Sequence, residues 1–184
     1  GNHPRGERAA IEGLALARGG AKVLFEDALR YARDHSVTLR ASATHGPGTG
    51  TRLSESGDAP SRAIAVTGDD QLIAVDVSQA DRAGVTAAIT RSGLRLRRRS
   101  GAVLHLDTRN AHGDVIWPDG VIDRGPVAVV SAVGSALGES LADHETATGA
   151  LERAGIATRD QGAAGDAIWW QVTPESLDKA VTVI

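Results

Sequence analysis

The chain has 184 residues, of which 41% are hydrophobic and 23% are charged, which are ordinary values for one large or two small globular domains. Its formal net charge is −3, so neither nucleic acid nor an anionic membrane is an expected partner. The lack of cysteine excludes disulfides and thiolate metal sites. No apolar run approaches the roughly 20 residues of a membrane helix. We therefore expect a cytoplasmic protein.

The first third of the chain predicts a small mixed segment. Residues 9–17 and 21–34 have helical patterns, and in the second of them apolar residues recur at steps of three and four. The alternating, β-branched residues 36–43 predict a strand, and the sequence HGPGTG at 45–50 predicts a turn. The polar residues 54–60 predict a linker and a domain boundary. The chain contains no Met even at position 1, so we expect a processed product or a fragment.

A repeated pattern follows this boundary. Its first copy has strand patterns at 62–66 and 72–77, a helix at 81–92, and two strands at 94–99 and 102–107 joined at Ser100-Gly101. Residues 109–125 form a polar connection. The second copy has a buried strand at 127–133, a small polar loop at 135–143, a helix at 144–154, a strand at 156–161, a turn at 162–165, a strand at 167–172, and a closing helix at 175–181 after Pro174. This order predicts an α+β fold with helices on one face of the sheet.

Five short motifs resemble the C-terminal region of aspartate kinases. They are GAKVLFEDA at 20–28, RAS at 40–42, PGT at 47–49, DRAG at 81–84 and VVSAVG at 129–134. The resemblance implies tandem ACT-like, ferredoxin-like βαββαβ units after a short remnant of an amino-acid-kinase domain. The implied segments are the remnant at 1–53, a linker at 54–61, a first ACT-like domain at 62–125 and a second at 126–184.

The same resemblance implies a regulatory role. ACT units bind a small amino acid, so the implied effector is lysine or threonine, the implied assembly is a homodimer, and the implied partner is a catalytic kinase domain or subunit. The glycine-rich kinase motif and its catalytic residues are missing from the sequence, so we expect neither phosphoryl transfer nor a cofactor. Lys22 lies in the family's nucleotide-site motif, and we interpret it as a vestige. The effector's identity and the sign of regulation stay open.

The predicted effector residues lie at two loops that each precede a helix, where free backbone N–H groups and the helix dipole favour a carboxylate. The positions are Ser78, Gln79, Asp81, Gly84, Val85, Ser135, Ala157 and Thr158. Asp81 has a second interpretation as a helix cap without a ligand. The family's asparagine after the second helix corresponds to Ala157, and its Ser-Glu pair is missing at 162–165. The alternative hypothesis is therefore a dimerising scaffold whose effector sites are degenerate.

Three further features favour structural roles. The arginines at 95, 97, 98 and 99 alternate with Leu94 and Leu96, which is typical of the solvated face of a strand or a protected edge. Trp169 and Trp170 are neighbours in one strand and should face opposite sides, one in the core and the other under the last helix or a partner. No two of the six histidines have metal-ligand spacing on one helix, so we expect no metal site.

Overall fold

The computed structural model describes residues 7–9, 26–35, 37, 39–41, 51–54, 65–134 and 136–184. The chain forms two compact units. One contains Gly1–Thr67, Ser131–Ala147 and Ala163–Ile168, and the other contains Gly68–Val130, Thr148–Gly162 and Trp169–Ile184. Among the described helices, none is long and apolar enough to cross a membrane.

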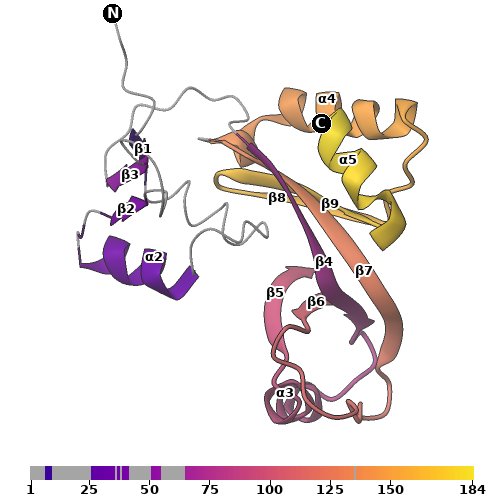
Figure 1. The fold of residues 1–184 in the computed structure, drawn as a ribbon. Helices are drawn as coiled ribbons and strands as arrows, with labels where there is room; N and C mark the ends of the chain where they lie inside the picture. The colour runs from indigo at the N-terminus through magenta and orange to yellow at the C-terminus, as the bar shows by residue number, and fades with distance from the viewer. Residues whose placement is uncertain are drawn as a thin grey trace, which may run out of the picture. The chain divides into compact units, whose positions relative to one another are not determined.

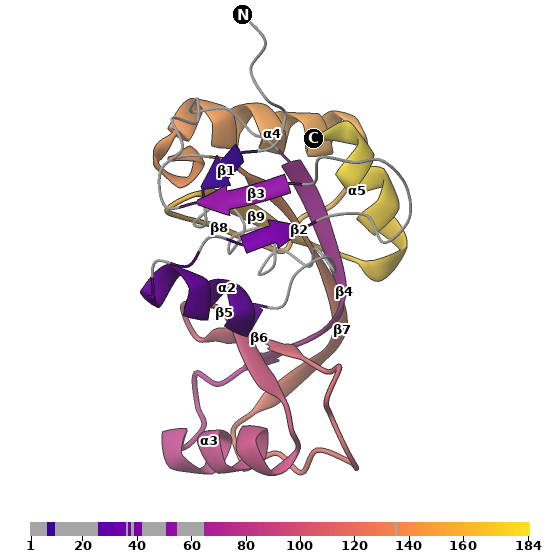
Figure 2. The same cartoon turned by 60° about the vertical axis from the view of Figure 1, so that its left-hand side comes forward.

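The described N-terminal elements are a small sheet and one helix (Figure 2). The strands β1 (Glu7–Ala9), β2 (Leu39–Ala41) and β3 (Thr51–Ser54) have the order β1-β3-β2, with β1 parallel and β2 antiparallel to β3. The helix α2 (Glu26–Asp34) buries Leu29 and Ala32, which confirms the apolar stripe in the described part of the helix predicted at 21–34.

Several predictions for this region have mixed outcomes. β2 confirms a strand within 36–43, whereas the strand β3 was not predicted. The helix prediction for 9–17 is wrong at Ala9, which lies in β1. The linker prediction is wrong at Ser54, which lies in β3. The remainder of the helix predicted at 9–17, the turn at 45–50 and the linker residues 55–60 lie outside the described residues.

A six-stranded sheet dominates the remainder of the chain (Figure 1). Its strands are β4 (Ala65–Asp76), β5 (Arg95–Ser100), β6 (Val103–Asp107), β7 (Ile122–Val133), β8 (Asp160–Ala164) and β9 (Ala167–Val172). The order is β5-β6-β4-β7-β9-β8, and β6 is antiparallel to both β4 and β5. The 12-residue strands β4 and β7 are the two central strands. The α+β fold is therefore confirmed.

The two copies of the repeat use the central strands in common. One copy reads β4-α3-β5-β6-β7 and occupies one end of the strand order, and the other uses β7-α4-β8-β9 at the opposite end. The strands predicted separately at 62–66 and 72–77 are one continuous strand, β4. Residues 108–121 run from β6 to β7 without a helix, so the first copy lacks the second helix of a βαββαβ unit. The domain boundaries inferred from the resemblance stay predictions.

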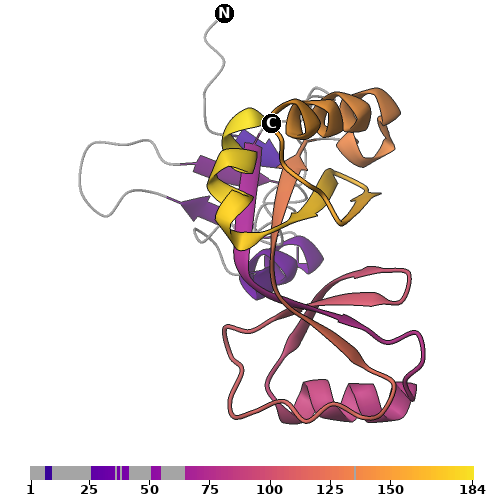
Figure 3. The same ribbon diagram turned by 90° about the vertical axis from the view of Figure 1, so that its right-hand side faces the viewer.

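The helix α3 (Arg82–Arg91) covers the β5–β6–β4 end of the sheet (Figure 3). Its core consists of Val75, Val85, Leu94, Leu104 and Leu106, all of which are buried. The turn after α3 ends at Gly93, which has φ +69°. Glycine is needed at this position because a Cβ would collide with the Asn110 carbonyl oxygen. The predicted helix at 81–92 and the hairpin at Ser100-Gly101 are confirmed.

The second copy contains a 3-10 turn (Leu137–Glu139), α4 (Leu141–Arg153), a second 3-10 turn (Pro174–Ser176) and α5 (Leu177–Val183). The helix predicted at 144–154 begins three residues earlier, because the Ser140 hydroxyl accepts a hydrogen bond from the Asp143 N–H at 3.2 Å. The strand predicted at 156–161 is also displaced. Gly162 belongs to β8, where a Cβ would meet the Trp169 ring at 2.7 Å, and the turn begins at Gly165.

Two sequence patterns have different outcomes in the sheet. A β-bulge between Leu96 and Arg98 breaks the alternation predicted for β5. The two leucines of the pattern also differ, since Leu94, which precedes the strand, is buried whereas Leu96 is 55% exposed. Trp169 and Trp170 are both buried on opposite faces, as predicted. Trp170 donates a hydrogen bond to the Thr148 hydroxyl of α4 at 3.0 Å, so α4 contacts it on that face.

Candidate functional site

In the first of the two predicted effector loops, which contains Ser78 and Gln79, the backbone bonds to and packs against groups of the same chain. The Ser78 N–H donates to Asp76 Oδ1 at 3.0 Å, and this hydrogen bond is the largest cause that lowers the pKa of Asp76. Arg124 adds an ion pair to Asp76 at 2.6 Å. Gly120 has φ +82° and lies directly against the Gln79 carbonyl, where a Cβ would collide. The connection 108–121 therefore packs on the loop that contains Ser78 and Gln79.

Asp81 is the N-cap of α3. Its carboxylate accepts hydrogen bonds from the Gly84 N–H at 2.8 Å and the Ala83 N–H at 3.3 Å. A side chain of the same chain thus occupies these N–H groups, and an effector role for this end of the helix stays a prediction. The capping interpretation of Asp81 is confirmed.

Gly84 is required for close packing at the same helix end. A Cβ at Gly84 would lie 3.2 Å from both Asp81 Oδ2 and Pro118 Cβ, which is a tight contact. Pro118 belongs to the connection that replaces a helix in this copy of the repeat. The first turn of α3 is therefore covered by Pro118.

Replacing Asp81 by Ala should lower the free energy of unfolding by about 1 kcal/mol, because two N–H groups of α3 lose their acceptor. Chemical denaturation measures the change. Asp81→Asn is the matched control, since Asn caps a helix about as well as Asp and should leave stability within about 0.5 kcal/mol of the parent. Equal losses in both variants would contradict the capping role.

A pocket of about 440 Å³ opens beside this helix, between α3, the loop that precedes it and the strands β5 and β6. It is lined by Val77, Ala80, Arg82, Val85, Thr86, Ile89, Thr90, Leu96, Arg99 and Leu104. This volume lies in the range of small-molecule sites. Val85 is the only predicted effector residue in the lining.

The lining is apolar with two cations and no carboxylate. The Thr86 hydroxyl donates to the Arg82 carbonyl at 2.9 Å, and the Thr90 hydroxyl donates to the Thr86 carbonyl at 3.0 Å. Their protons are therefore committed to the helix, and the guanidinium groups of Arg82 and Arg99 are the remaining strong donors. Arg99 uses its Nε on the Gly101 carbonyl at 2.8 Å. The pocket can thus accept a small molecule that carries a carboxylate and an aliphatic part.

Sequence reasoning missed Arg82, Thr86 and Arg99. Arg82 lies inside the DRAG motif, and Thr86 and Thr90 follow it at intervals of four residues, which places all three on one face of a helix. Arg99 was assigned to a solvated strand face. The bulge at Leu96–Arg98 changes which side chains of β5 turn toward α3, and no local pattern predicts it.

The residues predicted for the second effector site are Ser135, Ala157 and Thr158. Ser135 lies outside the described residues, Ala157 is exposed, and Thr158 is half-buried in the irregular segment before β8. The neighbouring loop is held by the β8–β9 turn, since the Ala136 N–H donates to Asp166 Oδ1 at 2.9 Å and the Gly138 N–H donates to the Gly165 carbonyl at 2.7 Å. An effector role for Ser135, Ala157 and Thr158 stays a prediction.

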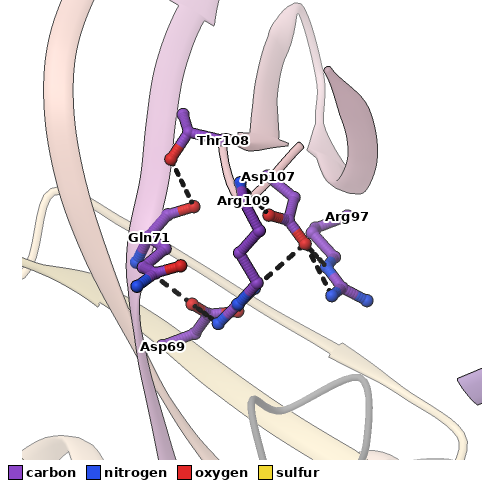
Figure 4. A network of polar contacts seen from close by, with 6 residues as sticks. All are labelled: Asp69, Gln71, Arg97, Asp107, Thr108 and Arg109. Carbon is purple, nitrogen blue, oxygen red and sulfur yellow. Dashed lines mark hydrogen bonds and ion pairs between the residues drawn. The ribbon is translucent and has the colours of Figure 1, made fainter. Parts of the chain in front are cut away.

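A second polar cluster is a buried ion-pair network, whose residues do not line the pocket (Figure 4). Arg109 bridges Asp69 at 2.6 Å and Asp107 at 2.9 Å, and Arg97 contacts Asp107 at 2.6 Å. The two carboxylates are each 3% exposed and are matched by two guanidinium groups. Because the charges balance and the carboxylates are already bonded, the network holds β4, β5 and β6 together.

Lys22 lies outside the described residues. Among the side chains that the structure describes, no three of His, Asp and Glu are grouped so that they could hold a metal ion.

Solved structures that match this fold include aspartate kinases. E. coli aspartokinase III in complex with aspartate and ADP has a TM-score of 0.77 at 20% identity, over 96% of this chain and 45% of that enzyme. Clostridium acetobutylicum aspartate kinase has a TM-score of 0.76 at 16% identity, over 97% and 48% respectively. The E. coli enzyme in complex with lysine and aspartate has a TM-score of 0.68 at 20% identity, over 96% and 44%.

The chain thus spans less than half the length of these enzymes. No protein-family model and no curated protein matches its sequence. At these identities the likeness establishes the fold, which is the one implied by the sequence motifs.

Proposed function

We propose that this chain is the regulatory part of an aspartate kinase, which binds an amino acid of the lysine and threonine group and has no phosphoryl-transfer activity alone. Two findings support the proposal. The structural similarity to aspartate kinases extends over nearly the whole of this chain, but the matched region is less than half of each enzyme. The E. coli enzyme also has a structure with lysine bound. Such a module would bias a catalytic partner by binding one of its states more tightly.

The observation that carries the proposal is the pocket beside α3. It lies next to the predicted loop, has the volume of a small-molecule site, and presents Arg82 and Arg99 without a neighbouring acid in its lining. An amino acid would place its carboxylate at Arg82 in a charge-assisted hydrogen bond and its side chain against Val85 and Ile89. Arg82 replaces the helix N–H groups that Asp81 occupies.

The lining favours threonine over lysine. Both amino acids have an α-ammonium group, but lysine adds an ε-ammonium group that needs a carboxylate or several carbonyl oxygens of its own, and no acidic side chain is among the described residues that line the pocket. Threonine has a methyl group that suits Val77 and Val85, and its hydroxyl can donate to an oxygen of Thr86 or Thr90. We therefore propose threonine as the effector to test first.

Isothermal titration of the chain with the common amino acids tests this function. Threonine should bind, and Arg82→Ala should weaken the binding about 10- to 100-fold, since a charge-assisted hydrogen bond contributes roughly 1.5–3 kcal/mol. Arg91→Ala is the matched control, because Arg91 is an exposed arginine in the last turn of the same helix and does not line the pocket. Absence of heat with every amino acid would remove the sensing role.

A scaffold role with a degenerate site is the second candidate, and the Asp81 cap favours it. If the helix N–H groups were the family's only means of holding a carboxylate, their occupation would leave the module without an effector. Melting curves distinguish the two roles. A dimer whose melting temperature is unchanged by all common amino acids supports the scaffold, whereas a shift with one amino acid supports sensing.

We also propose that the chain forms a homodimer through the β5 edge of the sheet. β5 is the last strand at this end of the sheet order, and Leu96 exposes 55% of its surface there. An exposed strand edge with an apolar side chain is a favourable place for a second copy to pair. Light scattering of the full chain should give a dimer mass. A monomer at all concentrations would exclude this assembly.

A further inference from the structure

Two hydrogen bonds join strands that lie far apart in the order of the sheet. His105 of β6 contacts Gln171 of β9, with Nε2 and Oε1 2.8 Å apart, although β4 and β7 lie between these strands. The Ser100 hydroxyl of β5 donates to Asp160 Oδ1 of β8 at 2.8 Å, although these are the two edge strands. In a flat sheet the first pair of strands would be roughly 14 Å apart and the second pair roughly 24 Å. The sheet must therefore curl until its outer hairpins meet.

The meeting point is buried and polar. His105 is 0% exposed and Gln171 is 2% exposed. The imidazole lies edge-on to the Trp169 ring, with centroids 5.4 Å apart. Its Nε2 is also 4.0 Å from Asp160 Oδ2. Among the described residues, neither His105 Nδ1 nor Asp160 Oδ2 has a hydrogen-bond partner.

This arrangement suits only the neutral imidazole. With Nε2 donating to Gln171, the neutral ring carries its lone pair on Nδ1, which tolerates an apolar surrounding better than an N–H does. A second proton would place an N–H group on Nδ1, which has no hydrogen-bond partner among the described residues, and a full charge on a buried ring whose nearby carboxylate oxygen, Asp160 Oδ2, is 4.0 Å from Nε2.

We propose that Ser100, His105, Asp160 and Gln171 form a proton-sensitive latch, which closes the outer hairpins of the sheet when His105 is neutral and opens when it takes up a proton. The latch joins the two copies of the repeat, because β5–β6 is the hairpin of the first copy and β8–β9 is the hairpin of the second. Its opening would change how rigidly the two halves of the repeat are coupled.

The charges that face His105 come from three strands. Burial is the largest effect and lowers the pKa of His105 below its ordinary value of 6.5. The hydrogen bond to Gln171 of β9 and the charge of Asp160 of β8 raise this pKa, whereas the charges of Arg98 of β5 and Arg124 of β7 lower it further. A histidine whose folded pKa is depressed contributes stability above the unfolded pKa, and this stability is lost as the pH falls toward the folded pKa. The latch should therefore be closed above pH 6.5 and weaken below it.

Spin-label distances test the latch in the full chain. Because the chain has no cysteine, Ala102→Cys and Gln161→Cys place one label after β5 and one in β8. The expected result is a short distance at pH 8 and a second, longer population that grows at lower pH. The ratio of long to short should rise up to about tenfold per pH unit below 6.5, since one proton is taken up on opening.

Two variants separate the latch from general acid unfolding. His105→Gln keeps an N–H donor for Gln171 but cannot titrate, so its long population should stay constant between pH 8 and pH 5. Asp160→Asn removes the carboxylate that favours protonation, so its transition should move to lower pH. A single distance at every pH in the parent, or an unchanged pH response in the His105→Gln or the Asp160→Asn variant, would overturn the proposal.

Discussion

Arg109→Met should lower the free energy of unfolding by about 3–5 kcal/mol, because breaking one member of a buried ion-pair network leaves a buried charge without compensation. Arg109 bonds both Asp69 and Asp107, each of which is 3% exposed. Met keeps much of the side-chain volume, so lost packing contributes little. Without Arg109, Asp69 loses both of its guanidinium hydrogen bonds.

The pH dependence of this variant gives a second test. Burial raises the pKa of Asp107, but the Arg109 N–H, the Arg109 side chain and Arg97 outweigh it and lower the pKa below the ordinary 3.8. A carboxyl with a depressed pKa contributes stability above its unfolded pKa and loses it as the pH falls through the folded value. The gap between parent and variant should therefore be full near pH 7 and shrink below pH 4.

Urea denaturation at pH 7 and pH 3.5 measures both effects. Arg91→Met is the matched control, since Arg91 is exposed at the end of α3 and should change stability by less than about 0.5 kcal/mol. A loss at Arg109 no larger than that at Arg91 would show that the network contributes nothing to stability.

Trp170→Ala should cost about 3–5 kcal/mol, because it removes a large side chain that is 0% exposed and leaves a cavity. Trp170 also donates its indole N–H to the Thr148 hydroxyl at 3.0 Å, which connects β9 to α4. Thermal and urea denaturation measure the loss.

Two milder variants divide this cost. Trp170→Phe keeps an aromatic ring but removes the indole N–H, and Thr148→Val keeps the volume at α4 but removes the acceptor. Thr148→Val should cost about 1–3 kcal/mol, since the indole N–H is left unsatisfied. If Trp170→Ala costs no more than Thr148→Val, the packing of the indole ring in this site is not what stabilises β9.

Strong local patterns were predictable from the sequence. The cap Asp81, the helix that follows it, the hairpin at Ser100-Gly101 and the strand Ala167–Val172 all carry local signals, namely a capping residue, a helical period and turn residues. The repeat was likewise visible. The sharing of β4 and β7 was not, because a 12-residue strand with a Gly-Asp-Asp sequence inside it has the same local pattern as two short strands.

Of the predicted effector residues, only Val85 lines the pocket beside α3, and the N–H groups of the helix end are bonded to Asp81. An aspartate before a helix can either attract a ligand's ammonium group or cap the helix, and only the three-dimensional structure shows that the Asp81 carboxylate accepts from the Ala83 and Gly84 N–H groups. Arg99 reached the pocket lining through a bulge in β5, and a bulge has no signal in a run of arginines. Long-range contacts such as His105 with Gln171 depend on the curl of the sheet, which no local sequence pattern specifies.

The most direct test of the regulatory site is hydrogen–deuterium exchange of the full chain with and without threonine. Slower exchange is expected at residues 77–90, which include the turn before α3 and the helix face that lines the pocket. Protection confined to residues 136–158, or no change anywhere at saturating threonine, would contradict it.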